Sequence, residues 1–140
     1  MSQLLYECIE FLEIVIGDDY EKYNLLMLKL LAEVETDLPD KAVQAVEVAQ
    51  KYWIEKKATN DDLKEARIKC WQHLDNNKDT INYNTKDYHV LRAAICLLYD
   101  SPELTDDMHD SLECFLEELS HILGNDAVLY ETVVKIIKEQ

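Results

Sequence analysis

Histidines and glutamates recur at helical spacing near the end of the chain. His109, Glu113, Glu117 and His121 follow one another at intervals of four residues, and Glu118 precedes His121 by three. The Glu-x-x-His spacing places both side chains on one helix face, as in the di-metal centres of helical bundles. Such a centre needs a second pair on another helix and further inward carboxylates, which the sequence does not offer. We therefore expect no metal ion and no other cofactor.

The four cysteines stand far apart in the sequence and form no CxxC pair: Cys8, Cys70, Cys96 and Cys114. A catalytic cysteine needs a histidine base within contact distance. Cys114 and His121 are seven residues apart, or roughly 10 Å along a helix axis, which excludes contact within that helix. Cys70 adjoins Trp71 in an apolar pattern and is expected in the core. The sequence thus predicts four free thiols, no catalytic residue and a protein that is not an enzyme.

Apolar residues recur with a period near 3.6 along almost the whole chain, which is typical of amphipathic helices. Predicted helix caps and helix stops at Ser2, Gly17, Pro39, Thr59 and Gly124 divide this pattern. The pattern predicts seven helices: one between Ser2 and Gly17, one after Asp18 to about Glu35, one from Pro39 to about Lys57, one opened by a Thr59–Asp62 capping box and reaching Leu74, one over Tyr88–Tyr99, one after Pro102 with an apolar stripe from Met108 to Leu123, and one over Asp126–Glu139.

These elements predict an all-α protein, with residues 1–140 forming a single helical domain, a bundle of about six to seven helices. The second and fifth helices are apolar on nearly all sides, so both are expected at the bundle centre. Two glycines and two prolines are too few for the turns of a β-rich fold. The longest run without a charge or strong polar group, Ala93–Tyr99, is far below the roughly 20 residues of a membrane span.

Acidic residues give the chain a net charge of −15, and the excess lies at its two ends. Residues 1–38 carry nine acidic and two basic side chains, and residues 101–140 carry ten and two. Residues 39–100 hold ten of each and are neutral. On the first and sixth helices, acids fall opposite the apolar stripe. These candidate partner-binding residues are Glu7, Glu10, Asp106, Asp110, Glu113 and Glu117.

A local excess of carboxylates steers association with cationic proteins and repels the phosphates of nucleic acids. We therefore expect a basic protein as partner, with no direct binding of nucleic acid and no membrane contact. The first residues lack the basic start and apolar centre of a secretory signal, so the sequence favours a cytoplasmic location. The alternative interpretation is that these acidic helix faces only contact solvent and keep the protein soluble, without binding a partner.

The predicted third to fifth helices share a pattern of small residues, tryptophans and cysteines at helical spacing. In this pattern the chain resembles small acidic all-helical bacterial toxin-immunity proteins: Ala42, Ala45, Ala49 and Trp53, then Ala66, Arg67, Cys70 and Trp71, then Leu91, Arg92, Ala93, Ala94 and Cys96. The resemblance implies a stoichiometric inhibitor that binds a cognate toxin domain and needs no cofactor. The acidic ends of the chain would suit a basic toxin.

Two other functions stay open at this point. The predicted third and fourth helices span about the length of one helical-hairpin repeat, which is compatible with an adaptor or repeat-type scaffold. A metal-dependent helical-bundle enzyme is the second alternative, and it would require the fold to bring His109 or His121 together with carboxylates in a pocket.

Overall fold

Helices are the regular elements of the computed structural model, which describes residues 2–100 and 108–139 and contains no strand within these ranges. This confirms the predicted all-α class. No described helix has the length and apolar character needed to cross a membrane. The helices are α1 (Gln3–Ile16), α2 (Tyr20–Val34), α3 (Asp40–Trp53), α4 (Asn60–Asn76), α5 (Lys86–Cys96), α6 (Met108–Leu123) and α7 (Asp126–Lys138).

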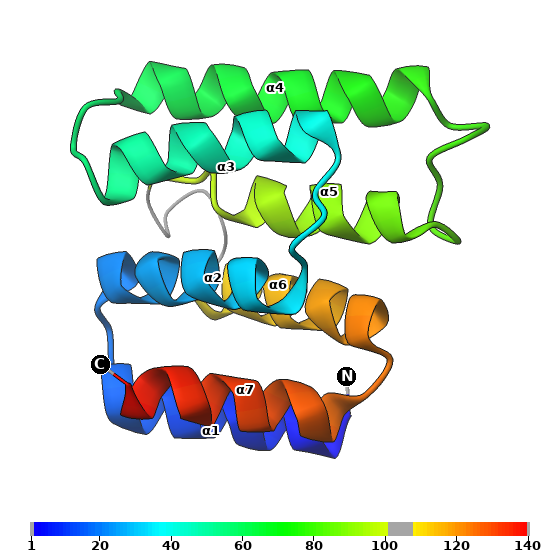
Figure 1. Cartoon of the computed structure of the whole chain (residues 1–140). Coiled ribbons are helices and arrows are strands. Elements are labelled where there is room, and N and C mark those ends of the chain that lie inside the picture. Colours follow the sequence, from blue (N-terminus) through cyan, green and yellow to red (C-terminus); the bar gives the residue numbers. More distant parts are fainter. Residues whose placement is uncertain (1, 101–107, 140) are drawn as a thin grey trace.

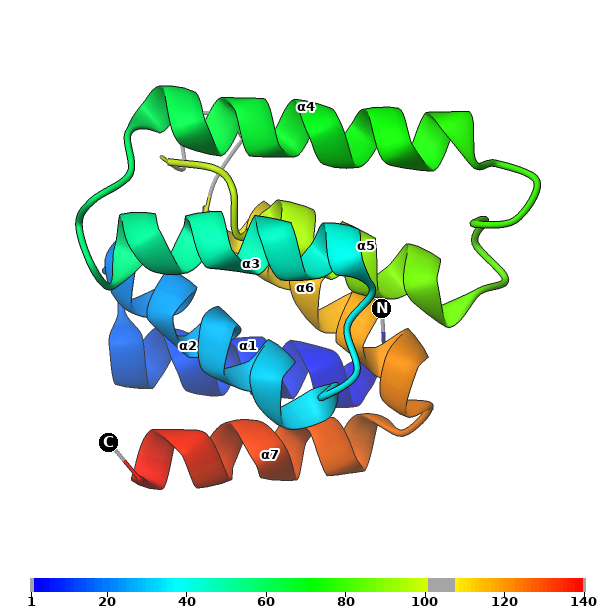
Figure 2. The ribbon, with the colours of Figure 1, turned by 45° about the horizontal axis from the view of Figure 1, so that its top comes forward.

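The helices stack in layers, and the helices of one layer run antiparallel to those of the next layer (Figure 1). α1 and α7 form one outer layer, α2 and α6 lie on it, α3 and α5 follow, and α4 covers them from the other side (Figures 1 and 2). α2 packs against α3, α6 and α7, while α5 packs against α3, α4 and α6. Both helices predicted to be central therefore lie in inner layers. α6 shares this interior place, because it packs against α1, α2, α5 and α7.

Helix ends follow the local signals of the sequence. The Ser2 hydroxyl accepts a hydrogen bond from the Leu5 amide, and Gly17 ends α1 with a φ of 74°. Thr59 and Asp62 form the predicted reciprocal capping box at the start of α4. The third helix is shorter than predicted. It stops at Trp53 because the chain turns at Lys56, whose φ of 59° lies in the left-handed region.

One continuous core connects all seven helices. Two side chains in or next to this core donate to the backbone: the Trp53 indole donates to the Leu97 carbonyl at 3.0 Å, and the Arg67 guanidinium donates to the Leu98 carbonyl at 2.6 Å. These carbonyls follow the end of α5, where no helical partner is left for them. Side chains from α3 and α4 thus stabilise the buried chain that leaves α5.

A partly buried ion pair joins the end of α2 to the start of α5. Glu35 accepts from the Lys86 ammonium at 2.8 Å and from the Asp37 amide at 3.0 Å. The hydrogen bond from Lys86 is the main reason that the pKa of Glu35 lies below its ordinary value. A carboxylate with a lowered pKa stabilises the fold above its ordinary pKa, and this contribution is lost as the pH falls through the lowered value.

Replacing Glu35 by glutamine is expected to lower the free energy of unfolding at pH 7 by about 1–2 kcal/mol, because Lys86 loses its charged acceptor. The deficit should shrink as the pH falls from the ordinary glutamate pKa through the lowered pKa of Glu35, because the wild-type carboxylate then becomes protonated as well. Urea unfolding at several pH values measures this. Glu33→Gln is the matched control on the same helix: Glu33 pairs with Lys135 in an exposed setting, where a loss below about 1 kcal/mol is expected. A pH-independent difference between Glu35→Gln and wild type would contradict the assignment.

Candidate functional site

The two acidic ends of the sequence come together in space. α1 and α2 pack with α6 and α7, and these four helices form one half of the bundle (Figure 1). We call them the acidic half, and α3, α4 and α5 the neutral half. Within the described residues, positions 2–38 carry nine acids and two bases and positions 108–139 carry seven and two, whereas positions 39–100 are neutral. The net negative charge, which lies at the two ends of the sequence, is therefore concentrated in one half of the folded molecule.

The outer face of α1 is the most open part of the acidic half. Leu5 and Leu12 point into the core, so residues on the opposite side of the helix face solvent. Glu7 and Glu10 are exposed there, as predicted from the periodicity, and they form no ion pair with any described residue. Ile14 stands beside them with 84% of its surface exposed. This α1 face combines free carboxylates with an unprotected apolar side chain.

Further exposed apolar side chains surround this face. Leu4, Tyr6 and Val15 of α1 and Val128 of α7 are among the exposed large apolar residues of the described surface. A shallow groove of about 370 Å³ lies between the same two helices and is lined by Leu4, Ala127, Tyr130, Glu131 and Val134. An apolar centre with a charged surround is the usual make-up of a protein-binding surface.

The sixth-helix acids occupy different environments. Glu113 and Glu117 are half-buried, because α6 is an inner helix with neighbours on several sides. The side chain of Asp110 and the whole of Asp106 lie outside the described residues. Of the six candidate residues, the structure therefore places Glu7 and Glu10 on the open surface and Glu113 and Glu117 in partly covered positions.

Glu118 and His121 take part in a contact between α5 and α6. Glu118 is buried and lies 2.6 Å from Nδ1 of His89, whose Nε2 lies 3.0 Å from the Tyr83 carbonyl. The rings of His89 and His121 stack with centroids 4.4 Å apart. The sequence could not identify His89 as the partner, because 29 residues separate it from Glu118.

This contact is not a metal centre as it stands. Among the residues that the structure describes, no group of three or more histidine, cysteine, aspartate or glutamate side chains is arranged to hold a metal ion. His89, Glu118 and His121 instead form a polar link inside the α5–α6 packing.

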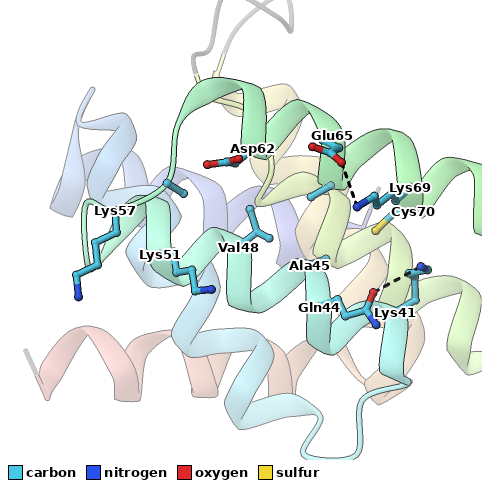
Figure 3. A pocket seen from close by; sticks show the side chains of 12 residues that line it. Lys41, Gln44, Ala45, Val48, Lys51, Lys57, Asp62, Glu65, Lys69 and Cys70 are labelled. Carbon is cyan, nitrogen blue, oxygen red and sulfur yellow. Dashed lines mark hydrogen bonds and ion pairs between the residues drawn. The ribbon is translucent and has the colours of Figure 1, made fainter.

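The neutral half contains a groove of about 410 Å³ between α3 and α4 (Figure 3). Small side chains such as Ala45 and Val48 line it together with charged ones: Lys41, Lys51, Lys57, Lys69, Asp62 and Glu65. Lys69 pairs with Glu65 at 3.1 Å. Burial raises the pKa of the Cys70 thiol to about 11, so it stays protonated at neutral pH. The groove thus carries a small positive excess and no reactive group.

Comparison of the chain with protein-family models, with curated proteins and with solved structures found no match.

Proposed function

We propose that this chain is a bacterial immunity protein, which neutralises a cognate basic toxin domain by one-to-one binding in the cytoplasm. The observation that carries the proposal is the gathering of the acid excess in one half of the bundle. A basic partner approaching that half meets carboxylates from both ends of the chain at once. Such a field accelerates association and orients the partner before contact.

The proposed contact surface begins at the α1 face. Glu7 and Glu10 supply charge, while Tyr6, Ile14 and the α1–α7 groove supply apolar area that a partner can cover. Burial of such apolar side chains inside a charged rim provides affinity, and the charges provide orientation. The proposed surface also includes the other acidic candidates of the sequence: Asp106, Asp110, Glu113 and Glu117.

Binding alone is sufficient for this function. An inhibitor that occupies the active surface of a toxin performs no chemistry, so the proposed mechanism involves no catalytic residue and no cofactor. Nucleic acid is a poor ligand for the acidic half, because its phosphates would face the same carboxylates.

The test is co-expression with the product of the adjacent upstream gene, for which the proposal predicts a toxic C-terminal domain. Cells that carry both genes should grow, and the two proteins should co-purify in a 1:1 complex, whereas the toxic domain alone should arrest growth. Growth rescue without a complex would contradict the stoichiometric mechanism. Absence of both rescue and complex would contradict the proposed function.

An adaptor is the second candidate, favoured by the lysines around the α3–α4 groove. That groove offers a positive surface in the neutral half, remote from the α1 face (Figures 1 and 3). A scaffold protein could therefore hold a basic partner on the acidic half and an acidic one on the groove. Two partners bound at the same time, with no effect on toxin activity, would favour the adaptor over the inhibitor.

A further inference from the structure

Two cysteines from different helices meet between α5 and α6. Cys96 is the last residue of α5, and Cys114 lies in the first half of α6. Both line a small cavity of about 130 Å³, together with Trp71, Arg92 and Tyr99. The cavity has room for several water-sized molecules, since a water occupies about 30 Å³ in the liquid. Cys114 is only partly buried, whereas Cys96 is buried, so Cys114 is the member of the pair that a small reagent can reach.

The sulfur of Cys114 is held between two donors. The Cys96 thiol donates a hydrogen bond to it, and the Arg92 guanidinium donates to it at 3.8 Å. Arg92 is itself fixed, because it donates to the Tyr88 hydroxyl at 2.8 Å and lies 5.1 Å from the centroid of the Trp71 ring. Donors aimed at a sulfur stabilise its thiolate form.

These contacts separate Cys114 from the other thiols. The hydrogen bond from Cys96 and the charge of Arg92 lower the pKa of Cys114 to about 7, although burial opposes the shift. The same hydrogen bond, and then burial, raise the pKa of Cys96. Burial raises the pKa of Cys8 to about 12 and that of Cys70 to about 11. At neutral pH, Cys114 is therefore the one cysteine with a substantial thiolate fraction.

We propose that Cys114 and Cys96 form a peroxide-reactive thiol pair, in which Cys114 is oxidised first and Cys96 then closes a disulfide between α5 and α6. The geometry that carries this proposal is the lining of one small cavity by both cysteines, with the fixed Arg92 guanidinium 3.8 Å from the Cys114 sulfur.

The chemistry uses one hydrogen peroxide and two thiols. The Cys114 thiolate attacks one peroxide oxygen, so that an S–O bond forms, the O–O bond breaks, and the departing hydroxide takes up a proton to become water. Cys96 then loses its proton and attacks the Cys114 sulfenic acid, forming the S–S bond and releasing hydroxide, which becomes water with that proton. The two sulfur atoms together lose two electrons, and the peroxide is reduced to two waters.

Oxidation would connect the two halves of the bundle. α5 belongs to the neutral half and α6 to the acidic half, so the disulfide would fix their packing covalently. The reaction is independent of the proposed partner and would occur in the isolated protein.

The test is peroxide treatment of the purified full-length protein at pH 7, followed by peptide mass spectrometry. The expected product is a Cys96–Cys114 disulfide with a mass loss of 2 Da, while Cys8 and Cys70 keep their thiols and serve as internal controls. Cys96→Ser should instead accumulate a sulfenic acid at Cys114, which a 1,3-dione probe captures. Cys114→Ser should give neither product.

Iodoacetamide labelling of the untreated protein provides a second measurement that needs no variant. Cys114 should react at least about tenfold faster than Cys8 and Cys70 at pH 7, with a pH midpoint near 7. Arg92→Gln, checked for folding by circular dichroism, should move that midpoint upward. Equal labelling of all four cysteines, or a disulfide between another pair, would overturn the proposal.

Discussion

Replacing Phe115 by alanine is expected to lower the free energy of unfolding by about 3–5 kcal/mol, the usual range for a fully buried phenylalanine. Phe115 is 0% exposed and lies on α6, which packs against α1, α2, α5 and α7. The side chains around Phe115 belong to several packed helices, so they cannot easily move to fill the cavity that removal of the ring leaves. Since a small domain has only about 5–15 kcal/mol of stability in total, the variant should be marginally folded. Urea unfolding at 25 °C followed by circular dichroism measures the difference.

Phe11→Ala is the matched control for this experiment. Phe11 is the only other phenylalanine in the chain, and it is half-buried on the outer helix α1, where its ring meets Tyr130 at a centroid distance of 6.2 Å. Its removal should cost clearly less than that of Phe115, about 1–2 kcal/mol, because less apolar surface returns to water. An equal loss of stability in the two variants would contradict the assignment of α6 as an inner helix.

Reversing the charge of the α1 face is expected to slow association with the basic toxin domain by about 10- to 100-fold at low salt. The variant combines Glu7→Lys and Glu10→Lys, both at exposed positions outside any described ion pair. The substitutions change the net charge by four units in the acidic half, so the partner is repelled where it was attracted. Stopped-flow or surface-plasmon measurements give the rate, and circular dichroism verifies the fold.

Glu47→Lys combined with Asp61→Lys changes the net charge by the same amount in the neutral half. Both acids are exposed, on α3 and α4, and neither belongs to an ion pair among the described residues. Their reversal should affect the association rate much less than reversal on α1. Equal effects of the two double variants would show that net charge, and not the α1 face, governs binding.

Most of the helices could be predicted because their signals are local. Ser2, Gly17 and the Thr59–Asp62 capping box act within a few residues, so they can be recognised without tertiary information. The third helix was predicted too long, because the left-handed turn is formed by Lys56 and not by a glycine, which would have been a recognisable signal for a helix end. The interior place of α6 was also missed. Its acidic face gives it an amphipathic pattern, which is typical of a helix at the surface.

The candidate site could be predicted only in part. Exposure of Glu7 and Glu10 follows from the period of α1 alone. Both acidic ends of the sequence lie in one half of the bundle because α1, α2, α6 and α7 pack together. No local sequence pattern predicts this packing. The pairing of Cys96 with Cys114 is equally nonlocal, because the two cysteines lie on different helices.

The most direct measurement of the central claim is a calorimetric titration of the wild-type protein with the purified toxic domain at two ionic strengths. Binding through the acidic half predicts a 1:1 complex whose Kd rises at least about tenfold between 50 and 300 mM salt, because screening weakens charge attraction. A complex whose affinity is independent of salt, or no complex at all, would contradict the account.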